Sequence, residues 1–178
     1  MSTKSKDGVY SSKPDGCSSA PKKPLVYIKT YGCQMNVRDS ETVSVLLERH
    51  GYILTGRESE ADVVIVNTCS VRGKAEDKAL GKLGLLVASK RGHPDRIVGA
   101  MGCMVQRLKS DMFQKVRGLD FAVGTHRLST VPSVVDAVRA DRYPFIDISG
   151  DTATPLKAGQ AECLPRSWRG RLYTLHSK

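Results

Sequence analysis

The chain has 178 residues, a formal net charge of +10 and a hydrophobic share of 40%. This length suits one domain with a sizeable core and polar ends. Its five cysteines are an odd number, which excludes a complete disulfide framework, and no apolar run approaches the roughly 20 residues of a membrane span. Residues 1–15 also lack the apolar core of a secretory signal. We therefore expect a cytoplasmic protein that stays out of the membrane and keeps its thiols reduced.

Both ends of the chain are polar and basic. Residues 1–24 are rich in Ser, Lys, Pro and Gly, which predicts a disordered basic tail containing Cys17. A folded domain is expected over 25–150, and residues 151–178, with Cys163, are expected to form an irregular tail. Each tail carries a net charge of +3. An excess of positive charge favours binding to polyanions such as nucleic acid. A role in keeping the tails soluble explains the same charge equally well.

The folded part begins with a strand and a helix. Residues 25–31 form an apolar run that predicts a strand ending at Gly32 and Cys33. A helix is expected over 36–50, because Asn36 is a favourable N-cap residue and an apolar stripe follows it.

The second unit repeats this order. A short extended piece at 52–54 leads to residues 62–66, an almost unbroken β-branched run typical of a strand buried on both faces. This strand ends shortly before Cys69, and a helix is expected over 74–90 because its apolar residues recur on one face.

The third strand is expected over 96–101 and leads directly to Gly102 and Cys103. The remaining predicted elements are a helix over 105–115, a strand over 119–123, a helix over 130–139 and an edge strand over 145–148. This alternation predicts an α/β fold: a doubly wound, mostly parallel sheet of four to five strands with helices on both faces.

Three cysteines follow the first three long strands at nearly equal intervals. Cys33, Cys69 and Cys103 are 36 and 34 residues apart. Equivalent ends of parallel strands lie at the same edge of a sheet, so the three thiols are expected to converge on a metal site. A structural zinc site normally has a fourth protein ligand and closely paired ligands, whereas three cysteines suit a four-iron cluster with one open iron. The alternative is three buried cysteines that pack as small hydrophobes.

Four polar residues lie next to these cysteines and have two interpretations each. Gln34 and Asn36 flank Cys33, and Asn67 and Arg72 flank Cys69. They are able to donate hydrogen bonds to cluster sulfides or to bind an anionic substrate. The alternative is that Asn36 only caps the following helix and Arg72 only faces solvent.

Four short motifs resemble those of one known family. They are YGCQMN at residues 31–36 continuing to Asp39-Ser40-Glu41, NTCSVR at 67–72 followed by Ala75-Glu76, GCM at 102–104, and VGTHRL at 123–128. Together they resemble the motifs of the radical-SAM methylthiotransferases over roughly residues 25–150. Within that family, the Gln34-Met35-Asn36 sequence is similar to the branch that acts on tRNA; the branch that acts on a ribosomal protein usually has proline and lysine in place of Gln34 and Met35.

The resemblance implies a cofactor, a substrate and a partner. It implies that Cys33, Cys69 and Cys103 bind the auxiliary 4Fe–4S cluster of a tRNA methylthiotransferase. Such an enzyme adds a methylthio group to the isopentenylated adenosine beside the anticodon, so tRNA is the implied partner. We expect the protein to be a monomer. In the family, a second 4Fe–4S cluster in a radical-SAM domain cleaves S-adenosylmethionine.

The CxxxCxxC motif of that second cluster does not occur in these 178 residues, where Cys163 has no partner at the required spacing. The expectation is therefore a truncated or frameshifted product that is inactive without the radical-SAM half. Two other classes stay open: a stand-alone iron–sulfur or persulfide carrier, and a non-enzymatic α/β nucleotide- or flavin-binding domain. Against the last, the loop at Gly32 holds one glycine where a dinucleotide fingerprint has three.

Overall fold

The computed structural model describes residues 23–70 and 73–148, and the side chains of these residues except 73–75. The predictions for the two tails, and for Cys17, Arg72 and Cys163, lie outside the described residues. No helix in the described part of the chain is long and apolar enough to cross a bilayer.

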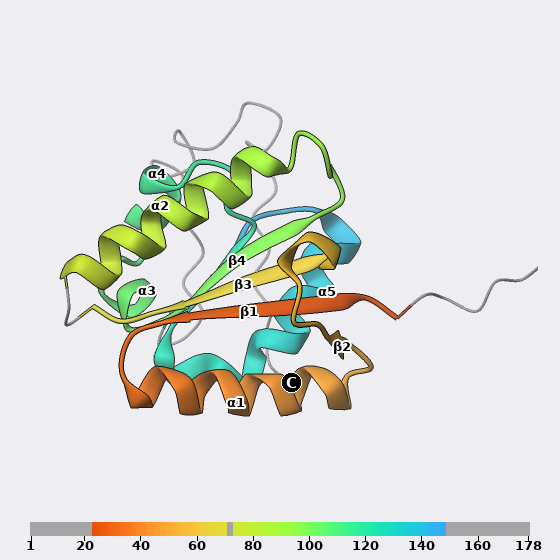
Figure 1. The fold of residues 1–178 in the computed structure, drawn as a ribbon, viewed down its shortest axis with the longest axis horizontal. Coiled ribbons are helices and arrows are strands. Elements are labelled where there is room, and N and C mark those ends of the chain that lie inside the picture. The colour runs from red at the N-terminus through yellow and green to blue at the C-terminus, as the bar shows by residue number, and fades with distance from the viewer. Residues whose placement is uncertain (1–22, 71–72, 149–178) are drawn as a thin grey trace, which may run out of the picture.

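Six parallel strands form one sheet in the order β2-β1-β3-β4-β5-β6 (Figure 1). The strands are β1 (Leu25–Tyr31), β2 (Ile53–Leu54), β3 (Val63–Thr68), β4 (Ile97–Gly102), β5 (Phe121–Val123) and β6 (Phe145–Asp147). The α/β class and the parallel sheet are confirmed, but the expected number of four to five strands is too small. The additional strand is β2, which has two residues and is expected from the sequence only as an extended piece at 52–54, whereas the three-residue β6 matches the edge strand expected at 145–148.

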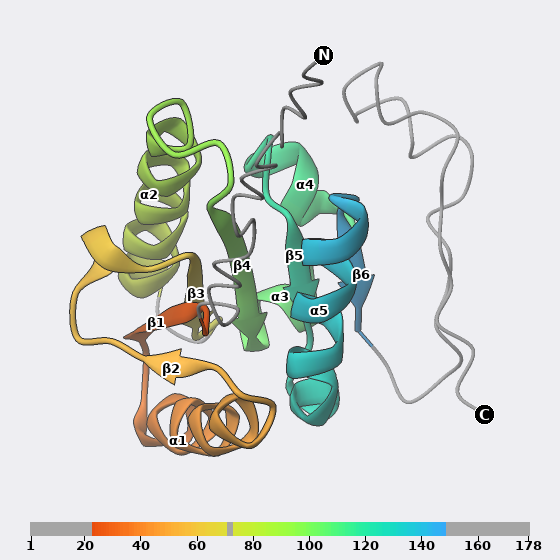
Figure 2. The same cartoon turned by 90° about the vertical axis from the view of Figure 1, so that its right-hand side faces the viewer.

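Helices cover both faces of this sheet, as predicted (Figures 1 and 2). On one face lie α1 (Gln34–Arg49) and α5 (Val131–Asp141), which contact each other. On the other face lie α2 (Gly73–Ser89), α3 (Cys103–Leu108) and α4 (Asp111–Lys115). Two 3-10 segments, the three-residue η1 (Glu58–Glu60) and the six-residue η2 (Thr125–Thr130), complete the described elements.

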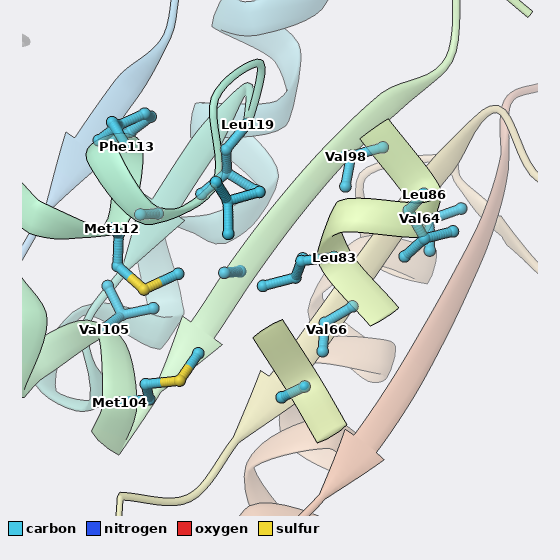
Figure 3. Close-up of a cluster of buried hydrophobic side chains, with 14 of the residues drawn as sticks. Val64, Val66, Leu83, Leu86, Val98, Met104, Val105, Met112, Phe113 and Leu119 are labelled. Atoms are coloured by element: carbon cyan, nitrogen blue, oxygen red, sulfur yellow. The ribbon is translucent and has the colours of Figure 1, made fainter. Parts of the chain in front are cut away.

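The two faces of the central strands bury separate cores. Every residue of β3 and β4 is buried, which explains why their apolar runs do not alternate with polar residues. Figure 3 shows the core beneath α2, α3 and α4, where Val64 and Val66 of β3 meet Leu83 and Met104 from the helices. With a core on each face, β1, β3 and β4 form a rigid platform whose ends are fixed relative to one another.

The order of the sheet reverses at β1. Strand β2 lies on one side of β1 and β3 on the other, and each later strand adds beyond β3. In open parallel sheets, ligands bind beside such a switch point at the carboxyl ends of the strands. The carboxyl ends of β1, β3 and β4 lie together at the left of Figure 1, where α1 and α3 begin.

The prediction that Asn36 caps the first helix is wrong. Helix α1 begins at Gln34, so Cys33 is the residue at the N-cap and Asn36 lies inside the first turn. The Asn36 side-chain oxygen accepts the backbone N–H of Cys33 at 3.2 Å, which is the reciprocal half of a capping box. The polar residue is therefore turned back toward the cysteine.

The helix predicted over 105–115 is two short helices. Helix α3 ends at Leu108, Lys109 has a φ of 51°, and α4 starts at Asp111. Both helices bury apolar side chains in the same core, among them Leu108 and Met112, and this packing outweighs the helical pattern of the sequence. No glycine marks the turn, so the sequence gives no sign of the break.

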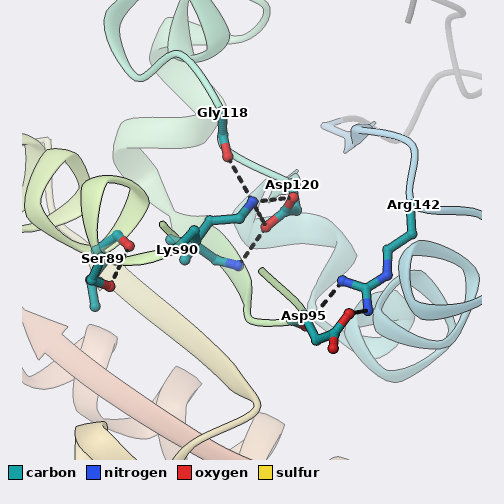
Figure 4. A network of polar contacts seen from close by, with 8 residues as sticks. Ser89, Lys90, Asp95, Gly118, Asp120 and Arg142 are labelled. Carbon is teal, nitrogen blue, oxygen red and sulfur yellow. Dashed lines mark hydrogen bonds and ion pairs between the residues drawn. The ribbon is translucent and has the colours of Figure 1, made fainter. Parts of the chain in front are cut away.

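Two ion pairs lie at the edge of the sheet where the strands begin (Figure 4). The Lys90 ammonium lies 2.7 and 2.8 Å from the two carboxylate oxygens of Asp120, and one of these oxygens also accepts the Val98 N–H. Arg142 binds Asp95 nearby at 2.8 Å. The buried carboxylate at this edge is thus satisfied by partners within the chain.

Candidate metal centre

The register of the sheet brings the three cysteines to one edge. Tyr31 pairs with Thr68, and Thr68 pairs with Gly102. The last residues of β1, β3 and β4 are therefore aligned across the sheet. Cys69 and Cys103 directly follow the last residues of β3 and β4. The Cys69 N–H donates to the Tyr31 carbonyl at 3.0 Å. Cys33 follows β1 after one intervening glycine. The predicted convergence at the carboxyl edge is therefore present in the backbone.

Two glycines let these strand ends approach closely. A Cβ at Gly32 would overlap the Asn36 amide and lie 2.8 Å from the Cβ of Cys69. Gly102 has a φ of +104°, and a Cβ there would lie 2.5 Å from the Asn67 side-chain oxygen and 2.6 Å from the Thr68 carbonyl. Neither position has room for a side chain. The Cys33 loop consequently lies against Cys69, and Gly102, the residue before Cys103, lies against the Asn67 amide.

The three thiols have different electrostatic surroundings, and none forms a disulfide. The backbone N–H groups of Asn36 and Met35 hold the pKa of the Cys33 thiol below its usual value, and an interaction with the Cys69 side chain acts in the same direction. These N–H groups belong to the first turn of α1, where an anion is favoured. The Cys33 thiol is thus favoured as a thiolate.

Burial raises the pKa of the Cys103 thiol, and the negative charges of Cys69, Asp39 and Cys33 add to that increase. All three groups are near enough to act on the Cys103 sulfur. Cys69 itself is only 2% exposed. Negative charges this close disfavour ionisation of the Cys103 thiol, and a bound cation or cluster would relieve that repulsion.

Two buried side-chain oxygens in the described part of the chain lack a hydrogen-bond partner, and both lie at this edge. They are Oγ1 of Thr68, the residue before Cys69, and Oε1 of Gln106, three residues after Cys103. Buried polar atoms without partners are rare and often mark the place of a bound water, ion or ligand. Sequence reasoning missed both residues, because an isolated threonine at a strand end or a glutamine in a helix carries no signal by itself.

The polar residues that flank the cysteines in the sequence have different positions. Asn36 and Asn67 are fully buried and lie together beneath the thiols. Gln34 instead faces an open hollow with a volume of about 490 Å³, lined by Gly32, Cys33, Gln34, Met35 and Val37. Met35 at its rim is 64% exposed. The hollow gives a route from solvent to the Cys33 thiol.

The structure does not gather these residues into a site for a single metal ion. No group of three or more His, Cys, Asp or Glu side chains among the described residues is gathered closely enough to hold one ion. The thiolates of a four-iron cluster bind different irons, so they lie further apart than the ligands of one ion. Three thiols at one edge, glycines without room for a side chain and two polar atoms without partners suit such a group.

Comparison with known proteins gives the family. Residues 25–124 match the profile of the family described as "Uncharacterized protein family UPF0004". The matched region is more than half of the chain and runs from the start of β1 to the end of β5. The chain belongs to this family. The UPF0004 region therefore contains all three cysteines and every strand of the sheet except β6.

Curated relatives share this region and have one name, tRNA-2-methylthio-N(6)-dimethylallyladenosine synthase. The Akkermansia muciniphila protein is 50% identical over 115 residues, which are 65% of this chain and 25% of the relative. The Opitutus terrae protein is 44% identical over 127 residues, or 71% and 26%. The Syntrophus aciditrophicus protein is 38% identical over 145 residues, or 82% and 32%. The resemblance drawn from the motifs is thereby confirmed, and the chain spans about a quarter to a third of the length of these relatives.

Proposed function

We propose that this chain carries the auxiliary cluster domain of a tRNA methylthiotransferase, in which Cys33, Cys69 and Cys103 hold one 4Fe–4S cluster. The observation that carries the proposal is the register of β1, β3 and β4, which ends three neighbouring strands at one level with a cysteine beyond each. The family match and the name of the relatives support it.

Each side chain has a defined task in this proposal. Cys33 binds as a thiolate that the backbone N–H groups in the first turn of α1 favour. Gly32 and Gly102 keep the strand ends close, and the Thr68 hydroxyl is available as a hydrogen-bond donor to the bound group. When bound, the cluster supplies a soft iron–sulfur surface with one iron that has no protein ligand, which suits a sulfur donor.

The substrate follows from the relatives. Their printed name points to a dimethylallyl-bearing adenosine of tRNA as the acceptor of the methylthio group, so we assign tRNA as the partner of the complete enzyme and the cytoplasm as its compartment. Cleavage of S-adenosylmethionine at a second cluster is assigned to a radical-SAM half, because its CxxxCxxC motif does not occur in these 178 residues. The monomeric state stays a prediction.

Anaerobic reconstitution with iron and sulfide tests the ligand set. The wild-type chain should take up about four irons and gain the broad visible absorption of a cluster. Cys33→Ala, Cys69→Ala and Cys103→Ala should each lose most of both signals, while the matched controls Cys17→Ala and Cys163→Ala should keep them. Circular dichroism of each variant separates loss of a ligand from loss of the fold.

Two results from the variants would contradict the assignment. One is unchanged iron content in a folded variant of any of the three cysteines. The other is loss of the cluster in Cys17→Ala or Cys163→Ala, which would transfer a ligand to the tails. A wild-type chain that binds a flavin or nucleotide but no iron would favour the non-enzymatic binding domain instead.

A further inference from the structure

Two fully buried asparagines join the strand ends that carry the cysteines. Asn36 lies in the first turn of α1 and Asn67 near the end of β3, and both are 0% exposed. The Asn36 amide nitrogen donates to the Asn67 side-chain oxygen at 3.0 Å. A buried amide is costly unless its groups are bonded, so this pair is maintained by specific partners on both sides.

Asn36 connects the pair to the first cysteine. Its side-chain oxygen accepts the backbone N–H of Cys33 at 3.2 Å and lies 3.5 Å from the Cys33 sulfur. The same amide group fills the space where a side chain at Gly32 would be, against Cys69. The position of the Cys33 loop therefore depends on the orientation of one amide.

Asn67 connects the pair to the other two cysteines. It precedes Cys69 by two residues, and its amide nitrogen donates to the Asn36 carbonyl at 2.7 Å and to the Ser40 hydroxyl at 3.0 Å. Its side-chain oxygen lies against Gly102, the residue before Cys103. Any displacement of Asn67 thus changes the distance between α1 and the ends of β3 and β4.

We propose that Asn36 and Asn67 are positioning residues that set the spacing of the three thiols for the cluster. The proposal rests on the cluster assignment above and deepens it. An amide suits this task because it donates and accepts without adding charge, whereas a carboxylate here would repel the thiolates. The pair fixes the scaffold before the cluster binds, in the way that outer partners orient metal ligands.

Cross-linking of the full-length apoprotein tests the spacing without a cluster. In a Cys17→Ala/Cys163→Ala background, dibromobimane joins only neighbouring thiols, and mass spectrometry identifies the joined pairs. Asn36→Ala and Asn67→Ala should slow cross-linking of Cys33 to Cys69 and to Cys103 about tenfold. Thr30→Val is the matched control, because it removes the 2.7 Å bond to Ser40 at the far end of the network and leaves the amide pair intact.

Release of iron from the reconstituted protein to a chelator gives a second readout. We expect both alanine variants to lose iron about tenfold faster or more, with an altered electron paramagnetic resonance signal of the reduced cluster, while Thr30→Val matches the wild type. If an alanine variant does not fold, Asn67→Leu keeps a similar side-chain volume, removes the bonds of the amide without adding a charge and allows the same comparison.

The outcomes separate this proposal from the cluster assignment. Folded variants that cross-link and retain iron like the wild type would overturn the positioning role and leave the asparagines as ordinary buried residues. A wild-type chain that takes up no iron would overturn the cluster assignment, and the cross-linking result would still decide whether the amide pair sets the spacing of the thiols.

Discussion

At the scale of single residues, the two glycines determine the shape of the cysteine edge. Gly102 combines a φ of +104° with contacts that leave no space for a Cβ. The sequence shows that a glycine precedes this cysteine. That the approaching atoms are the Asn67 amide and the Thr68 carbonyl follows only from the strand register.

Replacing Gly102 tests this feature. Gly102→Ala should lower the free energy of unfolding by about 1–3 kcal/mol, because alanine resists the positive φ and its Cβ meets Thr68. Gly84→Ala is the matched control, since Gly84 is exposed in α2 with no atom within 4 Å of its Cβ position. It should raise the same quantity by about 0.5–1 kcal/mol. Urea denaturation measures both, and equal effects would contradict the packing described here.

The cysteines themselves were predictable from the sequence, whereas their surroundings were predictable only in part. Spacing and motif indicated Cys33, Cys69 and Cys103, because parallel strands end at a common edge. Asn36 was assigned to a helix cap, but it lies one turn later and bonds Asn67. A contact between residues 31 positions apart depends on the packing of α1 on β3, which no local pattern encodes.

At the scale of elements, the long periodic segments were predictable and the break between two short helices was not. The strand at 25–31 and the helices at α1, α2 and α5 were predicted within about two residues, because their apolar patterns extend over several turns. The break between α3 and α4 was missed, since Lys109 adopts a φ of 51° without a glycine to signal it. Tertiary packing of both short helices on one core decides that turn.

The contact between the end of α1 and α5 has a predictable pH dependence. Tyr52 follows α1, its hydroxyl donates to Asp136 of α5, and Arg139 lies 5.8 Å from the ring centre. Burial raises the pKa of Tyr52 to about 12, and the Asp136 carboxylate acts in the same direction. The folded protein therefore retains a proton that the unfolded chain releases near pH 10. The stability that this contact contributes is complete below about pH 10 and is lost as the pH rises toward 12.

Tyr52→Phe tests this contact. At neutral pH the variant should be less stable by about 1 kcal/mol, because the hydrogen bond to Asp136 is lost. As the pH rises from about 10 to 12, the difference between wild type and variant should narrow, since only the wild type has a Tyr52 proton to lose. Urea denaturation across this range gives the difference directly. A gap that is independent of pH would show that Tyr52 does not titrate as described.

At the scale of the whole molecule, the two edges of the sheet differ in how their polar groups are satisfied. At the amino-terminal edge, the buried Asp120 has Lys90 and a backbone N–H as partners. At the carboxyl edge lie three thiols, the amide pair of Asn36 and Asn67, and the oxygens of Thr68 and Gln106, which have no hydrogen-bond partner. This asymmetry within the described residues supports the proposed cluster site at the carboxyl edge.

The architecture was predictable at this scale because alternating strands and helices permit few topologies. The sequence indicated the α/β class, the parallel sheet and the edge that carries the cysteines. It did not determine how far the sheet extends, because β2 and β6 depend on pairing with β1 and β5 for their existence. Nor did it reveal the two polar atoms without partners, since burial is a property of the assembled fold.

Mössbauer spectroscopy of the reconstituted protein tests most directly whether three cysteines, and no other residue of the chain, hold one four-iron cluster. Three irons then have a cysteine ligand and one does not, so adding a small thiol should change about one quarter of the iron signal. Cys17→Ala/Cys163→Ala should give the same result. Four irons that all remain unchanged by the added thiol would reveal a fourth protein ligand and contradict the account.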